Sequence, residues 1–112
     1  MTEAIELLKS INQQNLYQNL LVQIEKDFTL SNESINIPLG TNPEELFCLI
    51  SEKVYFLISN KFSEYLSLLY IIDVSENEIK QLDGSDLFIL SQQVAFLILK
   101  REYKKVYYKN KY

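Results

Sequence analysis

Apolar residues recur at steps of three and four along most of the chain, which is the spacing of amphipathic helices. The first helix is predicted from Thr2 or Glu3 to about Thr29, and the polar run at residues 12–15 is a point where it can divide in two. Residues 31–41 are predicted to form the longest loop, because they contain asparagine, proline and glycine at short intervals. The pattern therefore predicts a chain made mostly of long helices, joined by few loops.

The second helix has the clearest start in the sequence. Asn42 can cap it, Pro43 suits the first helical position, and Glu45 stands three residues after the cap. The apolar pattern then continues to Ile72, with a kink or break expected near Asn60. The positions predicted to face the core are Leu46, Phe47, Ile50, Val54, Leu57 and Ile58, and the apolar pattern continues through Phe62, Tyr65, Leu66, Leu69 and Ile72.

A short helix and a long one follow. Ser75 and Glu78 have the spacing of a capping box for a helix that reaches about Leu82, and residues 83–85 form a turn from which Asp83 or Ser85 can cap the last helix. That last helix is apolar on several sides, as is typical of a central helix, and Gln92 and Gln93 mark its most polar side. Its apolar positions are Leu87, Phe88, Ile89, Leu90, Val94, Phe96, Leu97, Ile98 and Leu99.

These elements predict an all-α fold, a compact bundle of four to five helices with the last helix at its centre. The 112 residues form one domain, residues 1–112, which is long enough to bury a core without metal or disulfide support. A helix from Ser85 to Tyr108 is roughly 36 Å long, whereas a globule of this size has a radius of gyration of about 13 Å. The end of the last helix should therefore reach the edge of the domain.

Charge is distributed unevenly, because residues 100–112 hold six of the eleven basic residues, four tyrosines and one acid. Residues 1–99 carry fourteen acids and five bases, and the whole chain has a net charge of −4. This asymmetry indicates that the C-terminal end makes contacts, with the acidic body, with a second copy or with another partner. The candidate interaction residues are Lys100, Arg101, Tyr103, Lys104, Lys105, Tyr107, Tyr108, Lys109 and Lys111.

Two interpretations of this basic end remain open beside self-association or binding to another protein. Lysines interleaved with tyrosines can bind a nucleic acid, here through Lys100, Arg101, Lys104, Lys105, Lys109 and Lys111. Alternatively, the lysines only complement the helix dipole, while the tyrosines complete the core or a dimer seam. The acidic net charge disfavours binding of nucleic acid by the whole domain.

Five carboxylates between residues 73 and 86 could bind a hard cation, but their spacing does not match an EF-hand loop. Helix caps, or ion pairs with the basic end of the same or a neighbouring chain, explain them without a metal. The acids are Asp73, Glu76, Glu78, Asp83 and Asp86.

Aromatic residues also fall at helical spacing. An aromatic-rich core is predicted ahead of a ligand pocket between helices. The aromatics concerned are Tyr55, Phe56, Phe62, Tyr65, Tyr70, Phe88 and Phe96.

The sequence lacks the usual equipment of an enzyme. Histidine is absent, and the single cysteine, Cys48, stands in an apolar helical pattern and is expected to behave as a small hydrophobe. No phosphate-binding loop, dinucleotide fingerprint or hydrolase motif occurs, so we predict no catalytic residues, no cofactor and no metal. A small enzyme or ligand binder with a carboxylate or tyrosine site remains a further alternative. Without a signal peptide or a membrane span, the expected location is the cytoplasm.

Three stretches resemble a group of short uncharacterised bacterial proteins of the kind found in Bacteroidota. They are LLYIIDVSE at residues 68–76, KQLDGSDL at residues 80–87 and FLILKREYKKVYYKNKY at residues 96–112. The resemblance implies a small cytoplasmic helical protein, and it implies no activity, ligand or catalytic residue.

Overall fold

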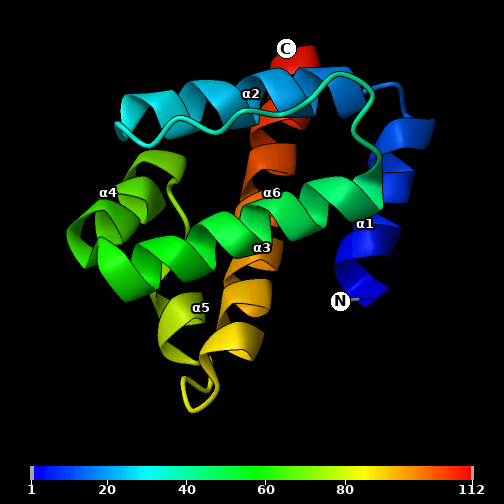
Figure 1. Ribbon diagram of the computed structural model, residues 1–112. Helices are drawn as coiled ribbons and strands as arrows, with labels where there is room; N and C mark the ends of the chain where they lie inside the picture. Colours follow the sequence, from blue (N-terminus) through cyan, green and yellow to red (C-terminus); the bar gives the residue numbers. More distant parts are fainter. Residues whose placement is uncertain (1, 112) are drawn as a thin grey trace.

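The chain folds into six α-helices in the part that the structure describes. The computed structural model describes residues 2–111, and within them every regular element is a helix (Figure 1). The all-α prediction is confirmed, and the radius of gyration is 13.2 Å. The helices are α1 (Thr2–Gln13), α2 (Tyr17–Leu30), α3 (Pro43–Asn60), α4 (Phe62–Ile72), α5 (Glu76–Lys80) and α6 (Leu87–Lys111).

Residues 2–111 form six helices rather than four or five because both expected breaks occur. The first divides α1 from α2 at Asn15, whose φ of 60° is left-handed, a conformation that asparagine tolerates better than most residues. The N–H of Leu16 donates to the carbonyl of Ile11 at 3.2 Å and closes this turn. The second divides α3 from α4 at Lys61, with φ −142° and ψ 64°.

The start of α3 is the predicted capping box. The Asn42 side chain accepts a hydrogen bond of 2.8 Å from the N–H of Glu45, and the Glu45 carboxylate accepts one of 3.1 Å from the N–H of Asn42. Residues 31–42 before it form the predicted loop, which the buried carboxylate of Glu33 ties down by ion pairs to Lys53 at 3.2 Å and Lys61 at 3.1 Å.

The Ser75 half of the capping box predicted for α5 is present, whereas the cap of α6 is not the predicted one. Ser75 accepts a hydrogen bond of 3.4 Å from the N–H of Glu78, and α5 then ends at Lys80, before the predicted Leu82. Neither Ser85 nor Asp83, the two residues predicted to cap α6, caps that helix.

The start of α6 is capped by Asp86, which accepts a hydrogen bond of 3.1 Å from the N–H of Ile89. Asp83 instead accepts from the N–H of Ser85 at 3.0 Å and holds the turn before the helix. The helix begins two residues later than the prediction placed it, and the cap moves with it.

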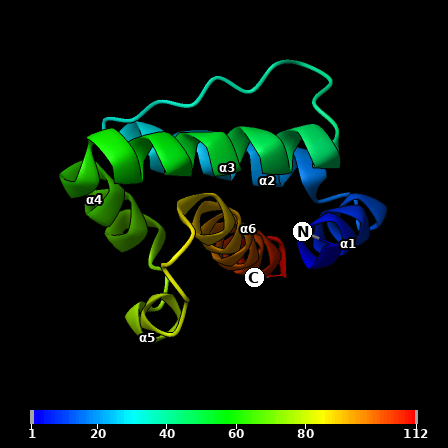
Figure 2. The same cartoon turned by 60° about the horizontal axis from the view of Figure 1, so that its bottom comes forward.

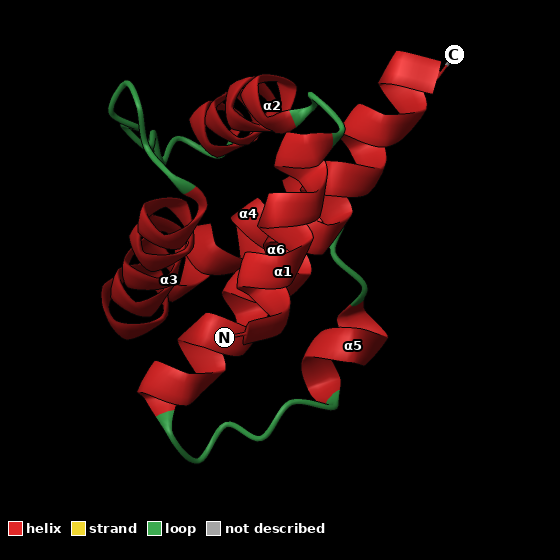
Figure 3. Ribbon diagram, turned by 90° about the vertical axis from the view of Figure 1, so that its right-hand side faces the viewer, coloured by secondary structure: helices red, strands yellow, loops and turns green. Residues whose placement is uncertain are grey.

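The last helix is central, as predicted. It packs against α1, α2, α3 and α4, and Figure 2 shows it enclosed by the others on most sides. The residues of α6 that are buried are Ser91, Val94, Ala95, Ile98, Leu99, Glu102 and Val106. Figure 3 shows its C-terminal end projecting beyond the body, which agrees with the expected length of the helix.

Some positions predicted to face the core are exposed. On α6 these are Phe88 and Ile89, because α6 crosses α3 rather than running along it and its first turns are left partly uncovered (Figure 1). On α4, Phe62 and Leu66 of the continuing apolar pattern are also about half exposed. The remaining predicted core positions of α3 and α4 are buried, apart from Ile58, which is half-buried.

Candidate interaction surface

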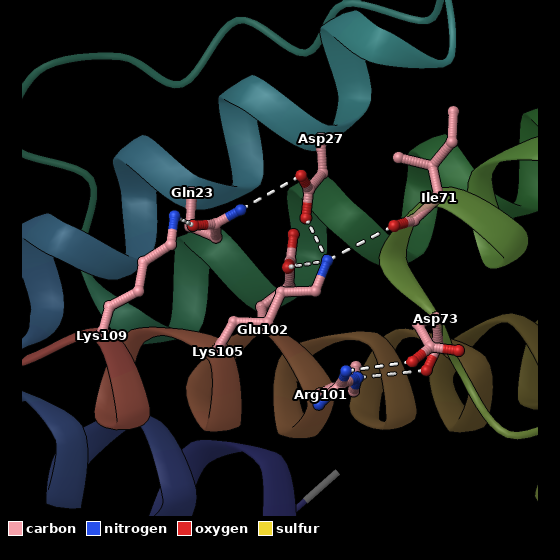
Figure 4. Close-up of polar contacts among 8 residues, drawn as sticks. All are labelled: Gln23, Asp27, Ile71, Asp73, Arg101, Glu102, Lys105 and Lys109. Atoms are coloured by element: carbon pink, nitrogen blue, oxygen red, sulfur yellow. Dashed lines mark hydrogen bonds and ion pairs between the residues drawn. The ribbon is translucent and has the colours of Figure 1, made fainter. Parts of the chain in front are cut away.

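The inner side of the C-terminal half of α6 is bonded to α2 and to the end of α4. Lys105 Nζ donates to Asp27 Oδ2 at 2.7 Å and to the carbonyl of Ile71 at 3.4 Å. Gln23 Nε2 donates to Asp27 Oδ1 at 3.1 Å, and Lys109 Nζ donates to Gln23 Oε1 at 2.8 Å (Figure 4). Two lysines that the sequence marked as interaction candidates are therefore engaged within the chain.

Glu102 lies in the middle of these contacts and is completely buried. Within residues 2–111 neither of its carboxyl oxygens accepts a hydrogen bond, although Lys105 Nζ lies 3.5 Å from Oε1. Burial, and then the hydrogen bond and charge of Asp27, raise the pKa of Glu102 to about 9. Glu102 is therefore protonated at neutral pH, and the O–H can donate to Asp27. We call Gln23, Asp27, Glu102, Lys105 and Lys109 the inner clasp.

Asp27 responds in the opposite direction. Burial by itself would raise the pKa of Asp27, but hydrogen bonds from Glu102, Lys105 and Gln23 outweigh it and hold the pKa below its ordinary value. The centre of the clasp thus contains one ionised acid, one neutral acid and the ammonium group of Lys105, with no net charge to bury. A carboxylate site open to a substrate is not formed here, because Glu102 has no exposed surface.

Glu102 is not among the candidate residues predicted from the sequence. The available signal was its position on α6, because Ala95, Ile98, Leu99 and Val106 share its side of the helix at steps of three and four and are all buried. An acid at the centre of such a row is expected to lose its charge or to gain a partner.

The first basic residues of the C-terminal end pair with the acidic stretch. Arg101 Nη2 lies 3.0 Å from Asp73 Oδ2, and Arg101 Nε donates to the Asp73 carbonyl at 3.1 Å. Lys100 lies 3.8 Å from Glu78, with both side chains about half exposed. The prediction that the basic end of the same chain pairs with these acids is confirmed for these two pairs. The other acids, Glu76, Asp83 and Asp86, lie in the first turn of α5, in the turn before α6 and at its cap.

Tyr103 lies between the inner and outer sides of α6. Its hydroxyl donates to Gln14 Oε1 at 2.9 Å, which connects α6 to the turn between α1 and α2. Its ring lies 6.0 Å from the ring of Tyr107, centroid to centroid. This half-buried tyrosine therefore supports the exposed rings beside it.

The outer side of the same helix carries exposed side chains. The rings of Tyr107 and Tyr108 meet edge to face with centroids 5.4 Å apart, and Lys111 Nζ lies 5.7 Å from the centre of the Tyr107 ring. Together with Lys104 these residues occupy positions i, i+3, i+4 and i+7, which is one side of a helix. We call this set the outer stripe: Lys104, Tyr107, Tyr108 and Lys111.

The prediction of an aromatic core is wrong for most of the aromatics it named. Tyr65 is buried and Phe96 is half-buried, but the other five are exposed. Helical spacing places residues on one side of a helix and does not tell whether another helix covers that side. The exposed five are Tyr55, Phe56, Phe62, Tyr70 and Phe88.

Two of the exposed rings line a groove between α3 and the start of α6, which we call the α3–α6 groove. Its volume is about 400 Å³ and its walls are mostly apolar. Cys48, which the sequence predicts to behave as a small hydrophobe, is exposed and lines this groove. The lining residues include Phe47, Cys48, Ser51, Glu52, Tyr55 and Phe88.

Comparisons with protein-family models, with curated proteins and with solved structures found no match to the chain. The resemblance to short bacterial proteins therefore stays a sequence-based prediction. Within the described residues, no group of three or more histidine, cysteine, aspartate or glutamate side chains is placed to hold a metal ion. Among the helices of residues 2–111, none combines the length and the apolar character needed to cross a membrane.

Proposed function

We propose that this protein is a non-enzymatic interaction module that associates with a second copy of itself through the outer stripe of α6. The observation that carries the proposal is the division of one basic helix into two sides. Lys105 and Lys109 are bonded to α2, whereas the outer stripe is exposed on another side of the helix. We also propose that it acts in the cytoplasm, the location predicted from the sequence.

The composition of the outer stripe supports binding to protein. Tyrosine is enriched at the centres of protein interfaces, because it buries a large ring while its hydroxyl still finds a partner. Tyr107 and Tyr108 are both exposed at a projecting helix end, and Tyr103 packs against the first of them. Side chains that already contact one another lose less freedom on binding, which lowers the entropic cost of association.

Nucleic-acid binding through the same end is the alternative, and the inner contacts disfavour it. Four of the six cations that it needs have partners within the chain: Lys100 with Glu78, Arg101 with Asp73, Lys105 with Asp27 and Lys109 with Gln23. A cation that already has a partner must give it up to bind a phosphate, so both the affinity and its salt dependence would be reduced. A salt-dependent affinity for an oligonucleotide between 50 and 200 mM salt, abolished by Lys104→Glu, would favour this alternative over self-association.

Sedimentation velocity of the full chain over a concentration series tests the proposal. The wild-type chain is expected to gain mass with concentration, and the variant Tyr107→Ala/Tyr108→Ala is expected to remain monomeric. Tyr70→Ala is the matched control, because Tyr70 is 86% exposed on α4 and lies outside the outer stripe. Point substitutions are preferable to a chain ending at Leu99, since Glu102 and Val106 beyond it belong to the core. A wild-type chain that stays monomeric up to about millimolar concentration would contradict the proposal.

A further inference from the structure

The α3–α6 groove has acidic surroundings. Residues 43–52, which form the first half of α3, contain three glutamates and no base. Glu52 lines the groove, and Glu44, Glu45 and Glu52 line an adjoining hollow that shares Cys48 with it. Glu44 pairs with Lys9 at 3.8 Å, with both side chains exposed. Such a weak surface pair leaves the negative charge of this edge largely in place.

The same glutamates also act on a neighbouring helix. Burial raises the pKa of the Tyr17 hydroxyl to about 12, and the charges of Glu45 and Glu44 add to the effect. Tyr17 lies on α2 and donates to the carbonyl of Thr41 at 2.8 Å, so the field of these glutamates extends to a neighbouring element. A helix that docks here should therefore carry positive charge beside its apolar anchors.

The outer stripe has this composition. An amphipathic helix that binds in a groove presents anchors at positions i, i+3, i+4 and i+7. On α6 these positions are Lys104, Tyr107, Tyr108 and Lys111, with two rings between two ammonium groups. The rings match the apolar walls of the groove, where Phe88 is 63% exposed, and the lysines match its acidic edge.

The two surfaces cannot meet within one molecule. Both include residues of α6, where Gln92 at the groove and Tyr107 in the stripe are separated by about 23 Å of rigid helix. The inner clasp also holds the C-terminal half of α6 against α2. A contact between stripe and groove therefore requires a second copy.

We propose that the outer stripe of one copy docks into the α3–α6 groove of a second copy, with Tyr107 and Tyr108 in the groove and Lys104 and Lys111 facing Glu44 and Glu52. This inference rests on the proposed self-association and specifies its partner surface. When two copies exchange stripes, the two reciprocal contacts form an isologous dimer with two-fold symmetry. When they do not, the contact is heterologous and continues to longer assemblies.

Charge reversal tests this arrangement on the full chain. Lys104→Glu/Lys111→Glu makes the stripe negative, and Glu44→Lys/Glu52→Lys makes the groove edge positive. Each variant alone brings like charges together, so each is expected to be monomeric at concentrations where the wild-type chain associates. An equimolar mixture pairs the negative stripe with the positive groove and the native stripe with the native groove, and it is expected to associate again.

The control for the groove variant carries an equal charge change elsewhere. Glu6→Lys/Glu76→Lys alters two exposed acids of α1 and α5, and it is expected to associate as the wild-type chain does. Circular dichroism at matched concentration establishes that every variant is folded. An increase in ionic strength should weaken the association of the wild-type chain and of the mixture.

The outcomes separate this inference from the proposed function. A wild-type chain that associates while Glu44→Lys/Glu52→Lys associates equally well would overturn groove docking and leave self-association in place. A mixture that stays monomeric would do the same. A wild-type chain that is monomeric throughout would overturn both.

Discussion

Replacing Glu102 by glutamine should stabilise the protein at neutral pH, although this glutamate is fully buried inside the fold. Glutamine has the same shape, and its amide N–H can donate to Asp27 as the protonated carboxyl does. The amide needs no proton to remain neutral. The unfolded chain holds an ordinary glutamate, ionised at pH 7, whereas the folded chain must bind a proton at Glu102.

The size of the effect follows from the difference in pKa. With a pKa of about 9 in the folded chain and 4.5 in the unfolded chain, the proton uptake at pH 7 costs about 3 kcal/mol. Since the folded-state pKa is raised, the contribution of Glu102 to stability is complete below pH 4.5. It is lost progressively as the pH rises to about 9. The free energy of unfolding of Glu102→Gln should therefore exceed that of the wild-type chain slightly at pH 5, by about 3 kcal/mol at pH 7 and by more at pH 8.5.

Urea unfolding followed by circular dichroism at these three pH values measures the difference. Glu6→Gln is the matched control, since Glu6 is exposed on α1, and its stability should follow that of the wild-type chain at every pH. If Glu102→Gln were destabilised at pH 7 and the difference did not change with pH, Glu102 would be ionised in the folded protein. The account of a neutral acid in the clasp would then be wrong.

Two further substitutions test the inner clasp and the start of α3. Asp27→Asn removes the anionic partner of Lys105. Unfolding experiments should show that the free energy of unfolding falls by less than is typical when a buried ion pair is broken, which is about 3–5 kcal/mol, because Glu102 can ionise and pair with Lys105 instead. In that background the gain from Glu102→Gln at pH 7 should shrink, and an undiminished gain would show that Asp27 and Glu102 are not coupled. Asn42→Ala should cost about 1 kcal/mol in thermal unfolding because the α3 cap is removed, whereas an unchanged midpoint would mean that Glu45 or water satisfies the exposed N–H groups instead.

Local chemistry explains why much of the fold could be predicted. The caps at Asn42 and Ser75 depend on residues three positions apart, so the sequence contains both partners of each contact. The breaks at Asn15 and Lys61 follow from short polar segments that interrupt an apolar pattern. Each of these features is decided within one turn of helix, where propensity and capping outweigh tertiary contacts.

The candidate site depends on contacts that span the chain, and these were only partly predictable. Charge asymmetry identified the C-terminal end, but it could not tell which lysines turn inward, since Lys105 meets an acid 78 positions away. The exposure of Phe88 and Tyr55 follows from the crossing of α3 and α6, which no periodicity encodes. Glu102 combines both difficulties, because its burial is periodic but its neutrality depends on Asp27 of α2.

The inner clasp and the proposed interface depend on each other through the stiffness of α6. Helix ends ordinarily fray, and a frayed stripe would lose conformational entropy when it docks. Lys105 and Lys109 bind α2 from the same turns of α6 that carry Tyr107 and Tyr108. These contacts therefore hold the part of α6 that carries the outer stripe against α2. The basic residues that make internal contacts therefore contribute to association indirectly, by presenting the tyrosines in one fixed arrangement. On this reasoning, Asp27→Asn should weaken self-association even though Asp27 lies outside the stripe and the groove.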